Sequence, residues 1–290
     1  MTANRGIPVT VMVQTKNEEV GLRACLAGLR DFDEVVVIDS NSTDATVDIA
    51  QGMDATVVNF TWNGKYPKKK QWQLQNVETK HAWVLFMDAD ETPSTELINE
   101  LRSLHLERPT TAAAYDIRLD YVFAGRVLRH GHRVVKRALV HRDRVRFPIV
   151  DDLDAPGMGE LEGHYQPEAS GPVKSLRGRI THDDKDPVRT WFDRHNRYSD
   201  WEAFLRLRPD SREEIAQRRS KQGKLFDLVP FKPAIFFGYS FIMRAGFLDG
   251  RAGLDYALAL SMYYWQIGLK TRELDRNTRL SCVLGKSESP

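Results

Sequence analysis

The chain has 290 residues, with 42 lysines and arginines against 40 aspartates and glutamates, giving a formal net charge of +2. This balance excludes a strong overall field for binding polyanions, and the hydrophobic fraction of 41% permits a sizeable core in one large domain, or in a domain with an appendage. Only Cys25 and Cys282 occur, which excludes a disulfide framework and a paired-cysteine metal site and suits a reducing cytosol.

The N-terminal sequence "MTANRGIPVTVMV" lacks a basic-apolar-cleavage pattern, so we expect no secretion signal. No uncharged apolar run reaches the roughly 20 residues that a membrane-spanning helix needs. Residues 129–146 and 206–224 are dense in arginine and lysine. Such runs are typical of solvated faces or of contact with phosphate or anionic lipid.

Residues 7–110 alternate short apolar runs with helical patterns. The predicted strands are "VTVMVQT", "EVVVID", "ATVVNF" and "AWVLFMD". The predicted helices lie in "NEEVGLRACLAGLRDF", with Asn17 as N-cap, in the later part of "SNSTDATVDIAQGM", and in "KKKQWQLQNVETKH". This alternation predicts an α/β fold with a single, mainly parallel sheet flanked by helices.

Polar clusters follow the first, second and fourth predicted strands, as "QTKNEE", "DSNSTD" and "DADE". In a parallel sheet these clusters fall on the edge where ligands bind. Each has a local explanation as well, because Asn17 and Asp44 could cap helices and Asp39 could be a turn residue. Three clusters at corresponding strand ends nevertheless predict one shared ligand site.

The last cluster contains two aspartates, Asp88 and Asp90, separated by the small residue Ala89. Two such carboxylates can converge on Mg²⁺ or Mn²⁺, with the phosphate oxygens of a ligand filling other coordination positions. Ala89 allows the backbone to approach that ligand. The metal would offset the charge of a diphosphate and help it to depart.

Residues 111–225 have a different character. "AAAYDIRLDYVFAG" predicts one or two strands, residues 147–172 predict a long loop, and "DPVRTWFDRHNRYSDWEAFLRLR" predicts a helix whose aromatic side chains mostly pack. From Leu225 onward the chain is apolar, aromatic and basic together, and Gly246, Gly250 and Gly253 predict a division into short helices.

The segments "VTVMVQTKNEE", "VVVIDSNSTDAT" and "WVLFMDADE", in this order, resemble inverting glycosyltransferases of family 2, over roughly residues 6 to 225. The resemblance implies the A-type nucleotide-sugar-binding fold and transfer of a sugar from a nucleoside-diphosphate donor, UDP being favoured, to an acceptor hydroxyl. Mg²⁺ or Mn²⁺ is the implied cofactor.

The resemblance also implies roles for individual residues. Thr15, Asn17 and Glu18 match the first nucleotide-contacting segment, and Asp39 and Asp44 match the segment that contacts the base and ribose.

Lys70 stands where relatives carry a basic residue near the diphosphate. Asp88 and Asp90 match the Asp-x-Asp motif, with Ala89 between them at the nucleotide-sugar. In this motif the second aspartate is the usual metal ligand and the first lies nearer the sugar or ribose.

Inversion requires a general base that takes the proton of the acceptor hydroxyl. Asp151, Asp152, Glu160 and Glu162 are the candidates in the loop-rich region. Transferases of the lipopolysaccharide-core type carry Val-His-Glu and, further along, Ile-x-His. Here "RITH" ends at His182 and Glu162 stands at the matching distance, which favours Glu162. The local sequence "GELEGHYQP" departs from that motif, so Asp152 and Glu160 stay open.

The segment "GFLDGRAGL" resembles the tail of the same lipopolysaccharide-core branch. Amphipathic helices with aromatic residues and flanking cations are typical of membrane interfaces. The alternatives are a helical pair packed on the domain and a dimer contact. We expect peripheral contact with the cytosolic face of the inner membrane through residues 226–290, a glycan acceptor that is lipid-linked or belongs to the lipopolysaccharide core, and no nucleic acid.

The predicted organisation has three parts: residues 1–110 as the nucleotide-sugar-binding half, residues 111–225 as the acceptor and catalytic half, and residues 226–290 as a helical extension. Two other functions fit parts of the sequence. "FMDADET" also matches a haloacid-dehalogenase-like phosphatase, with Asp88 as nucleophile and Asp90 as acid and base, although three strands precede it here. A catalytically inactive, membrane-associated scaffold is the other. A nucleotidyltransferase would need a glycine-rich basic loop, which "QTKNEE" is not.

Overall fold

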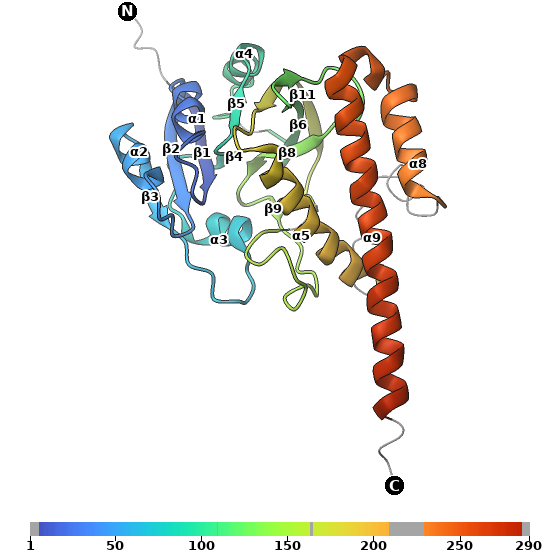
Figure 1. Cartoon of the computed structure of the whole chain (residues 1–290). Coiled ribbons are helices and arrows are strands. Elements are labelled where there is room, and N and C mark those ends of the chain that lie inside the picture. Colours follow the sequence, from blue (N-terminus) through green and yellow to red (C-terminus); the bar gives the residue numbers. More distant parts are fainter. Residues whose placement is uncertain (1–5, 109, 163–164, 209–228, 286–290) are drawn as a thin grey trace, which may run out of the picture. The chain divides into compact units, whose positions relative to one another are not determined.

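The computed structural model describes residues 6–108, 110–162, 165–208 and 229–285 (Figure 1). The chain divides into two compact units. Unit 1 contains Met1–Arg129, Arg133–Pro148 and Gln166–Asp186, and unit 2 contains His130–His132, Ile149–Tyr165 and Pro187–Pro290. The basic run 206–224 lies mostly outside the described residues, and the predicted three-part organisation stays a prediction.

Unit 1 holds the sheet. Its strands are β1 (Ile7–Thr15), β2 (Phe32–Asp39), β3 (Thr56–Asn59), β4 (Trp83–Asp88), β5 (Glu91–Pro93), β6 (Ala114–Phe123), β7 (Arg126–Val127), β8 (Val135–His141), β9 (Val145–Arg146), β10 (Glu168–Ala169) and β11 (Val173–His182). Its helices are α1 (Leu22–Gly28), α2 (Thr46–Gly52), α3 (Lys69–Asn76) and α4 (Thr95–Ser103).

Within the described residues, nine of these strands form one sheet in the order β3-β2-β1-β4-β8-β6-β11-β5, with β7 paired to β6. The first four strands of this order run parallel. β8 runs antiparallel to β4 and β6, while β11 runs parallel to β6 and antiparallel to β5. The predicted α/β fold with a mainly parallel sheet is therefore confirmed, and the second half of the chain adds the antiparallel pairings.

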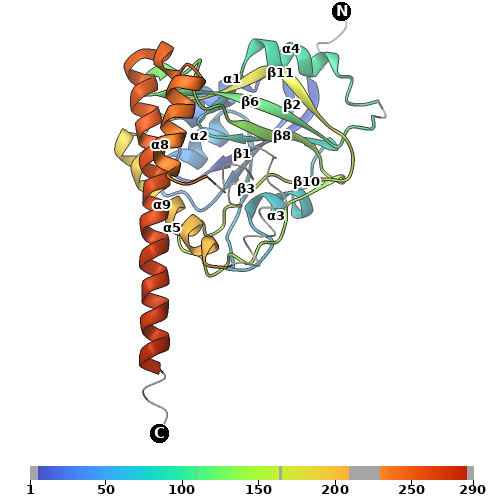
Figure 2. The ribbon, with the colours of Figure 1, turned by 90° about the vertical axis from the view of Figure 1, so that its right-hand side faces the viewer.

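Alternation along the strands produces two apolar faces. Val11 and Val13 of β1 join a core cluster with side chains of α1, α2 and α4. Met12, between them, joins a second cluster with Leu74 of α3. Helices therefore cover both faces of the sheet, and both clusters lie within unit 1 (Figure 2).

Local contacts fix α4 against the sheet. The Ser94 side chain caps this helix by accepting a 3.1 Å hydrogen bond from the backbone N–H of Leu97. A Cβ on Gly178 of β11 would lie 2.3 Å from the Leu97 Cα, so glycine permits the strand to pass this close to the helix. The N-cap predicted at Asn17 is wrong, because Asn17 has a φ of 59° and α1 begins only at Leu22.

Unit 2 is helical. Its elements are α5 (Val188–Arg206), α8 (Lys232–Phe237), the π-helical turn η1 (Gly238–Met243), the 3₁₀ turn η2 (Gly246–Asp249) and α9 (Gly250–Gly285). The aromatic packing expected of α5 is present at Trp201, which is fully buried, but not at Phe192, which is exposed. The rings of Phe236 and Tyr264, 4.9 Å apart, join α8 to α9, and the two helices lie side by side (Figure 1).

The predicted division of the C-terminal region into short helices is wrong for α9, which runs for 36 residues, about 54 Å. Gly253 lies within α9, where a Cβ would meet the Gly246 carbonyl oxygen at 2.0 Å. This glycine therefore permits close packing on η2 instead of ending a helix. Among the described helices, none has the length and apolar content to cross a membrane.

Candidate functional site

The carboxyl ends of three neighbouring strands lie level with one another. Thr15, the last residue of β1, pairs with Asp39, the last residue of β2. On the other side, Gln14 of β1 pairs with Asp88, the last residue of β4. The strand register therefore brings the three polar clusters of the sequence to one edge of one sheet.

Asp39 ties together the first two strand ends. The Thr15 hydroxyl donates to Asp39 Oδ1 at 2.9 Å, and the Ser42 backbone N–H donates to Asp39 Oδ2 at 2.8 Å. Asn17 adds a second connection, since its Oδ1 accepts from the Thr43 backbone N–H at 2.8 Å. Asp39 is thus a turn residue as well as a predicted ligand residue, and the loops after β1 and β2 hold each other in place.

Glu18 and Asp44 lie in the same two loops. The Glu18 backbone N–H donates to the Thr46 hydroxyl at 2.7 Å. Asp44 accepts from the backbone N–H groups of Thr46 at 3.0 Å and Glu19 at 3.2 Å. Desolvation raises the pKa of Asp44, but the hydrogen bond from the Thr46 hydroxyl and these backbone hydrogen bonds outweigh it, so the pKa is lowered. Asp44 is therefore an anionic residue just before α2, whose N-cap residue is Ala45 and not Asp44.

Helix α3 brings cations to this edge. Lys69 is buried, and its Nζ donates to the Thr15 carbonyl at 3.2 Å and to the Ser40 hydroxyl at 2.7 Å. The neighbouring Lys70 has its Nζ 6.0 Å from the centre of the Phe86 ring, and its charge acts on Asp88. Lys70 therefore lies close enough to act on Asp88, and its expected place near a diphosphate stays a prediction. Lys69 joins two strand ends, a role that the sequence analysis missed.

Lys136 of β8 holds the first part of the acid cluster together. Its Nζ lies 3.0 Å from Asp88 Oδ2 and 2.7 Å from Glu91 Oε2. The Asp88 backbone N–H also donates to Glu91 Oε2 at 2.8 Å. Glu91 is fully buried and the Asp88 side chain is 42% exposed, so only the aspartate of this pair presents a carboxylate to solvent. Ala89, next to Asp88, is buried.

The charges in this group act on one another. Desolvation raises the pKa of Asp88, but the ammonium groups of Lys136 and Lys70 outweigh it, and the pKa is lowered. Burial raises the pKa of Glu91, and the negative charge of Asp88 raises it further. Burial opposes the charge on Lys136, but the two carboxylates outweigh that effect and raise its pKa. Asp88 and Lys136 are therefore both charged at neutral pH.

Asp90 has a different partner. The antiparallel pairing of β5 with β11 sets His182 opposite Glu91, and His182 Nδ1 lies 3.2 Å from Asp90 Oδ1. Burial lowers the pKa of His182, but the carboxylates of Asp90, Glu91 and Asp88 outweigh it and raise the pKa to about 9. Asp90 and His182 thus form a second charged pair next to the first.

The donor set fits a hard divalent cation that is also bound by phosphate oxygens. Asp90 Oδ1 and His182 Nδ1 face each other while buried, and neither makes a well-directed hydrogen bond within the described part of the chain. Asp90 supplies the carboxylate oxygen that Mg²⁺ and Mn²⁺ prefer, whereas the imidazole nitrogen of His182 is a ligand better suited to zinc or iron. Within the same residues, no group of three His, Cys, Asp or Glu side chains is arranged around one metal position. A metal here would therefore need the oxygens of its substrate.

The predicted catalytic residues belong to unit 2. Asp152 is buried with 1% exposure, and its Oδ2 accepts a 2.9 Å hydrogen bond from the Trp201 indole. Glu160 and Glu162 are partly exposed, and Asp151 is exposed and lies 3.2 Å from Arg208. Asp152 is thus part of the packing around Trp201, whereas Glu162 lies where solvent reaches it.

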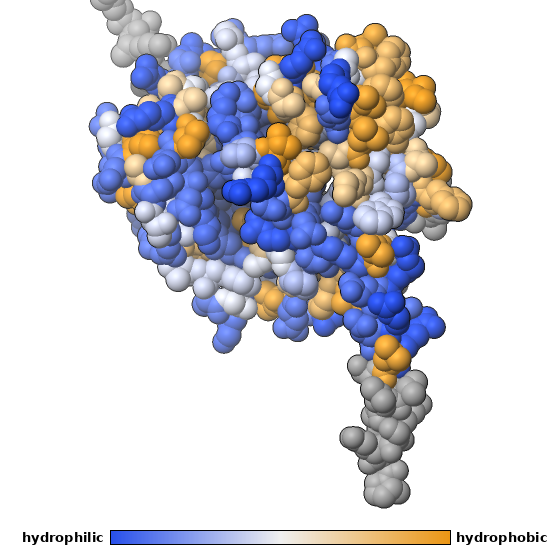
Figure 3. All heavy atoms as spheres, in the orientation of Figure 1, coloured by the Kyte–Doolittle hydropathy of each residue, from blue (hydrophilic) through white to orange (hydrophobic). Residues whose placement is uncertain are grey.

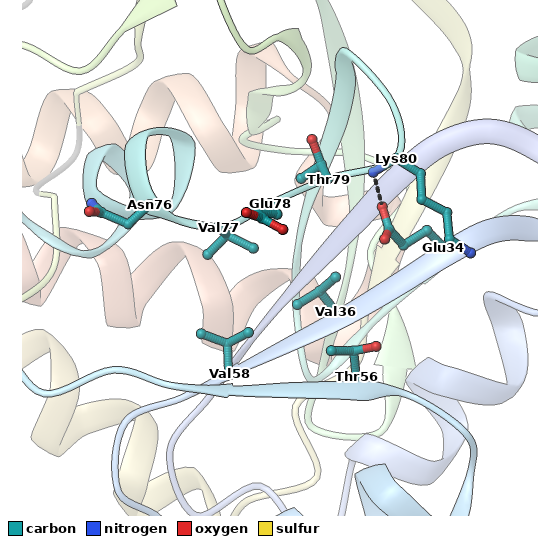
Figure 4. A pocket seen from close by; sticks show the side chains of 9 residues that line it. All are labelled: Glu34, Val36, Thr56, Val58, Asn76, Val77, Glu78, Thr79 and Lys80. Carbon is teal, nitrogen blue, oxygen red and sulfur yellow. Dashed lines mark hydrogen bonds between the residues drawn. The ribbon is translucent and has the colours of Figure 1, made fainter.

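A cavity of about 510 Å³ lies elsewhere in unit 1 (Figure 4). Val36 of β2 and Thr56 and Val58 of β3 line it, together with residues 76–80 at the end of α3 and beyond it. Glu34 also lines it and accepts a hydrogen bond from the Lys80 backbone N–H at 2.8 Å. These strand positions precede Asp39 and Asn59 in the register, so the cavity lies away from the carboxyl edge.

Besides Lys69, three residues in and around the acid cluster had no role in the sequence analysis: Glu91, His182 and Lys136. Glu91 stood in the quoted "DADE", and His182 stood in "RITH" as a marker of distance. Both residue types, a carboxylate and an imidazole, could therefore have been proposed as site residues from the sequence. Lys136 sits in a basic run with no motif, and only the pairing of β8 with β4 brings it to Asp88.

A family model described as "Glycosyl transferase family 2" matches residues 10–164, which is more than half of the chain. The chain therefore belongs to glycosyl transferase family 2, and the resemblance found in the sequence is confirmed at this level.

Curated relatives include an uncharacterized glycosyltransferase of Rickettsia bellii, 34% identical over 113 residues, covering 38% of this chain and 37% of the relative. The lipopolysaccharide core biosynthesis glycosyltransferase LpsC of Rhizobium meliloti is 31% identical over 90 residues, covering 29% and 32%. The chain spans less than half the length of the curated relatives it matches.

Among solved structures, the mannosyltransferase PcManGT of Pyrobaculum calidifontis, in complex with GDP-Man and Mn²⁺, is 16% identical. That match covers 91% of this chain and 86% of the mannosyltransferase, with a TM-score of 0.48.

Proposed function

We propose that the chain is a metal-dependent inverting glycosyltransferase. It moves a sugar from a nucleoside-diphosphate donor, with UDP favoured, to a hydroxyl of a glycan acceptor that is lipid-linked or part of a lipopolysaccharide core. Family membership supports the reaction class. The observation that carries the proposal is the level register of Thr15, Asp39 and Asp88, with the Asp90–His182 pair at the same edge.

In this proposal the two aspartates have separate tasks. Asp90 holds Mg²⁺ or Mn²⁺, and the facing His182 nitrogen is a second donor once its proton is displaced. When bound, the metal stabilises the negative charge of the departing diphosphate. Asp88, kept charged by Lys136, faces the sugar or ribose of the donor. It is also the second proposed aspartate ligand of the metal.

The other residues of the edge bind the nucleotide. Thr15 and Asp39 form the floor between β1 and β2, and Asn17, Glu18 and Asp44 lie in the loops that this floor joins. These loops lie where the base and ribose of the donor are expected.

Two groups contact the diphosphate. Lys70 supplies a positive charge next to Asp88. Ala89, the second residue proposed at the diphosphate, is buried, and its single methyl group keeps the chain between Asp88 and Asp90 narrow.

We propose Glu162 as the general base that accepts the acceptor hydroxyl proton. The hydrogen bond from Trp201 and the burial of Asp152 favour Glu162, because a base must reach its substrate. Glu162→Gln is expected to lower kcat by at least about a hundredfold while the affinity for UDP and Mn²⁺ stays within twofold. A kcat close to that of the wild type would remove Glu162 from this role and return weight to Glu160 and Asp152.

The proposed setting is the cytosolic face of the bacterial inner membrane, in lipopolysaccharide or exopolysaccharide assembly, with peripheral contact through residues 226–290. The partial similarity to LpsC supports the pathway. Exposed apolar side chains on α8 and α9 support the membrane contact.

Calorimetry of UDP, GDP and their sugar conjugates, with and without Mn²⁺, tests the donor site. The wild type is expected to bind one nucleotide in a metal-dependent manner and Asp90→Ala to lose that binding. The matched control Asp48→Ala removes an exposed carboxylate of α2 in the same unit and is expected to bind like the wild type. Absence of metal-dependent binding in the wild type would instead favour the inactive scaffold, and hydrolysis of a phosphate ester without a sugar donor would favour the phosphatase.

A further inference from the structure

Unit 2 exposes apolar side chains at the tip of the turn between α8 and α9. We call Ile242, Met243, Phe247 and Leu248 the apolar tip; each is at least 50% exposed, and Met243 reaches 78%. They lie on the short turns η1 and η2, which join the two helices. A soluble surface normally scatters such residues singly, so four within seven positions need an explanation.

A second exposed group runs along α9. Leu258, Met262, Trp265 and Leu269, which we call the α9 stripe, follow one another at steps of four, three and four residues and are 44–50% exposed. This spacing places them on one face of the helix. The opposite face is buried at Tyr256, Tyr263 and Ile267. Figure 3 shows apolar side chains gathered over α8 and over the part of α9 next to η2.

Backbone N–H groups of residues 130–132 form hydrogen bonds with the two turns that carry the apolar tip. The backbone N–H of His130 donates to Asp249 Oδ2 at 2.8 Å, and that of Gly131 donates to the Arg244 carbonyl at 2.9 Å. The His132 N–H donates to the Ser240 hydroxyl at 3.1 Å. Hydrogen bonds from residues 130–132 therefore fix the two turns in place, while the apolar side chains of the tip are exposed.

Basic residues slightly outnumber acidic residues near this surface, since Lys232, Arg244 and Arg251 stand against two carboxylates. From Phe231 to Leu269 the acidic residues are Asp249 and Asp255. Asp249 Oδ1 lies 2.9 Å from His130, and Asp255 lies 3.0 Å from Arg251. Arg244 is exposed directly beside Met243. The surface is thus apolar, with the exposed cation Arg244 next to its tip.

We infer that the apolar tip and the α9 stripe bind an anionic lipid bilayer, with the tip entering the boundary between headgroups and acyl chains. An apolar surface with the exposed arginine Arg244 beside it matches that interface, where binding grows with buried apolar area and with attraction to anionic lipids. A symmetric pair of copies joined at the tip would bring Arg244 close to its own counterpart, which like-charge repulsion disfavours. The inference deepens the proposed membrane contact and names its lipid class.

Co-sedimentation of the full chain with vesicles tests this surface. The wild type is expected to bind vesicles of phosphatidylcholine mixed with phosphatidylglycerol, and to bind phosphatidylcholine alone at least about tenfold less. Ile242→Gln/Met243→Gln, with its folding checked by circular dichroism, is expected to weaken binding to the mixed vesicles at least about tenfold. Ile149→Gln is the matched control, because it is 53% exposed in the same unit but lies outside both groups, and it is expected to bind like the wild type.

Three outcomes would overturn the inference: wild type that binds neither vesicle, a tip variant that binds like the wild type, or self-association in sedimentation equilibrium that the tip variant abolishes. The last would assign the surface to a second copy. Calorimetry with UDP and Mn²⁺ on the same preparations separates this result from the proposed function. Intact nucleotide binding without vesicle binding overturns the membrane surface alone, and the reverse overturns the donor site alone.

Discussion

Two regions depart from the usual rule that charged side chains are exposed and apolar ones are buried: the carboxyl edge of the sheet, and the apolar tip with the α9 stripe. Unit 1 buries charge at its edge, since Glu91 is 1% exposed and Lys136 is 12% exposed. Unit 2 exposes Met243, Trp265 and their apolar neighbours. Buried charge requires partners, and exposed apolar surface marks a place where something binds. The two departures therefore point to ligands of opposite kinds, a charged one at the sheet and an apolar one at the helices.

The largest expected effect is the loss of activity in Asp90→Ala. If Asp90 holds the metal against the diphosphate, its removal should lower kcat/KM for the donor by about a thousandfold, equivalent to about 4 kcal/mol of transition-state stabilisation. Steady-state kinetics with saturating Mn²⁺ measure this. Activity within tenfold of the wild type would mean that the acid cluster has a structural role only, and that its buried charge does not mark a ligand site.

Lys136→Met is expected to be the most damaging single change for stability at the edge. It removes the ammonium group 2.7 Å from the buried Glu91 and leaves His182, 4.0 Å away, as the remaining cation. Removing one partner of a buried ion pair costs about 3–5 kcal/mol of unfolding free energy. Urea denaturation measures the loss. The double variant Lys136→Met/Glu91→Gln should recover part of it, because the buried charge is then gone. Additive losses in the double variant would show that the pair does not act as a unit.

The smallest effect is expected on the exposed surface of α9. Met262→Gln should change the free energy of unfolding by less than about 0.5 kcal/mol, because a half-exposed side chain gives up little burial. Phe236→Ala is the buried counterpart on α8 and should cost about 3–5 kcal/mol. Thermal or urea unfolding compares the two. A large loss from Met262→Gln would mean that the α9 stripe serves folding instead of binding.

The alternation of apolar runs and helical patterns was sufficient to predict the four parallel strands and the three polar strand ends. Hydrophobic periodicity is local, and the carboxyl ends of parallel strands always share an edge, so Thr15, Asp39 and Asp88 could be grouped before their register was known. The prediction of an N-cap at Asn17 was wrong because this residue has a left-handed backbone conformation and its side chain binds the backbone of the next loop. Neither feature can be read from the local sequence. The prediction that the C-terminal glycines end short helices was wrong for Gly253, because this glycine permits a close contact with Gly246 inside a continuous helix.

By itself the sequence determined the fold class, the acid motif and its place at the end of a strand. Only the tertiary structure decided which partner each acid has. Lys136 reaches Asp88 because β8 pairs with β4, and His182 reaches Asp90 because β11 pairs with β5. Strand pairing over such distances depends on which surfaces close the core, and no local pattern encodes it. The same holds for the α9 stripe, whose exposure follows from the opposite face of the helix being the one that packs.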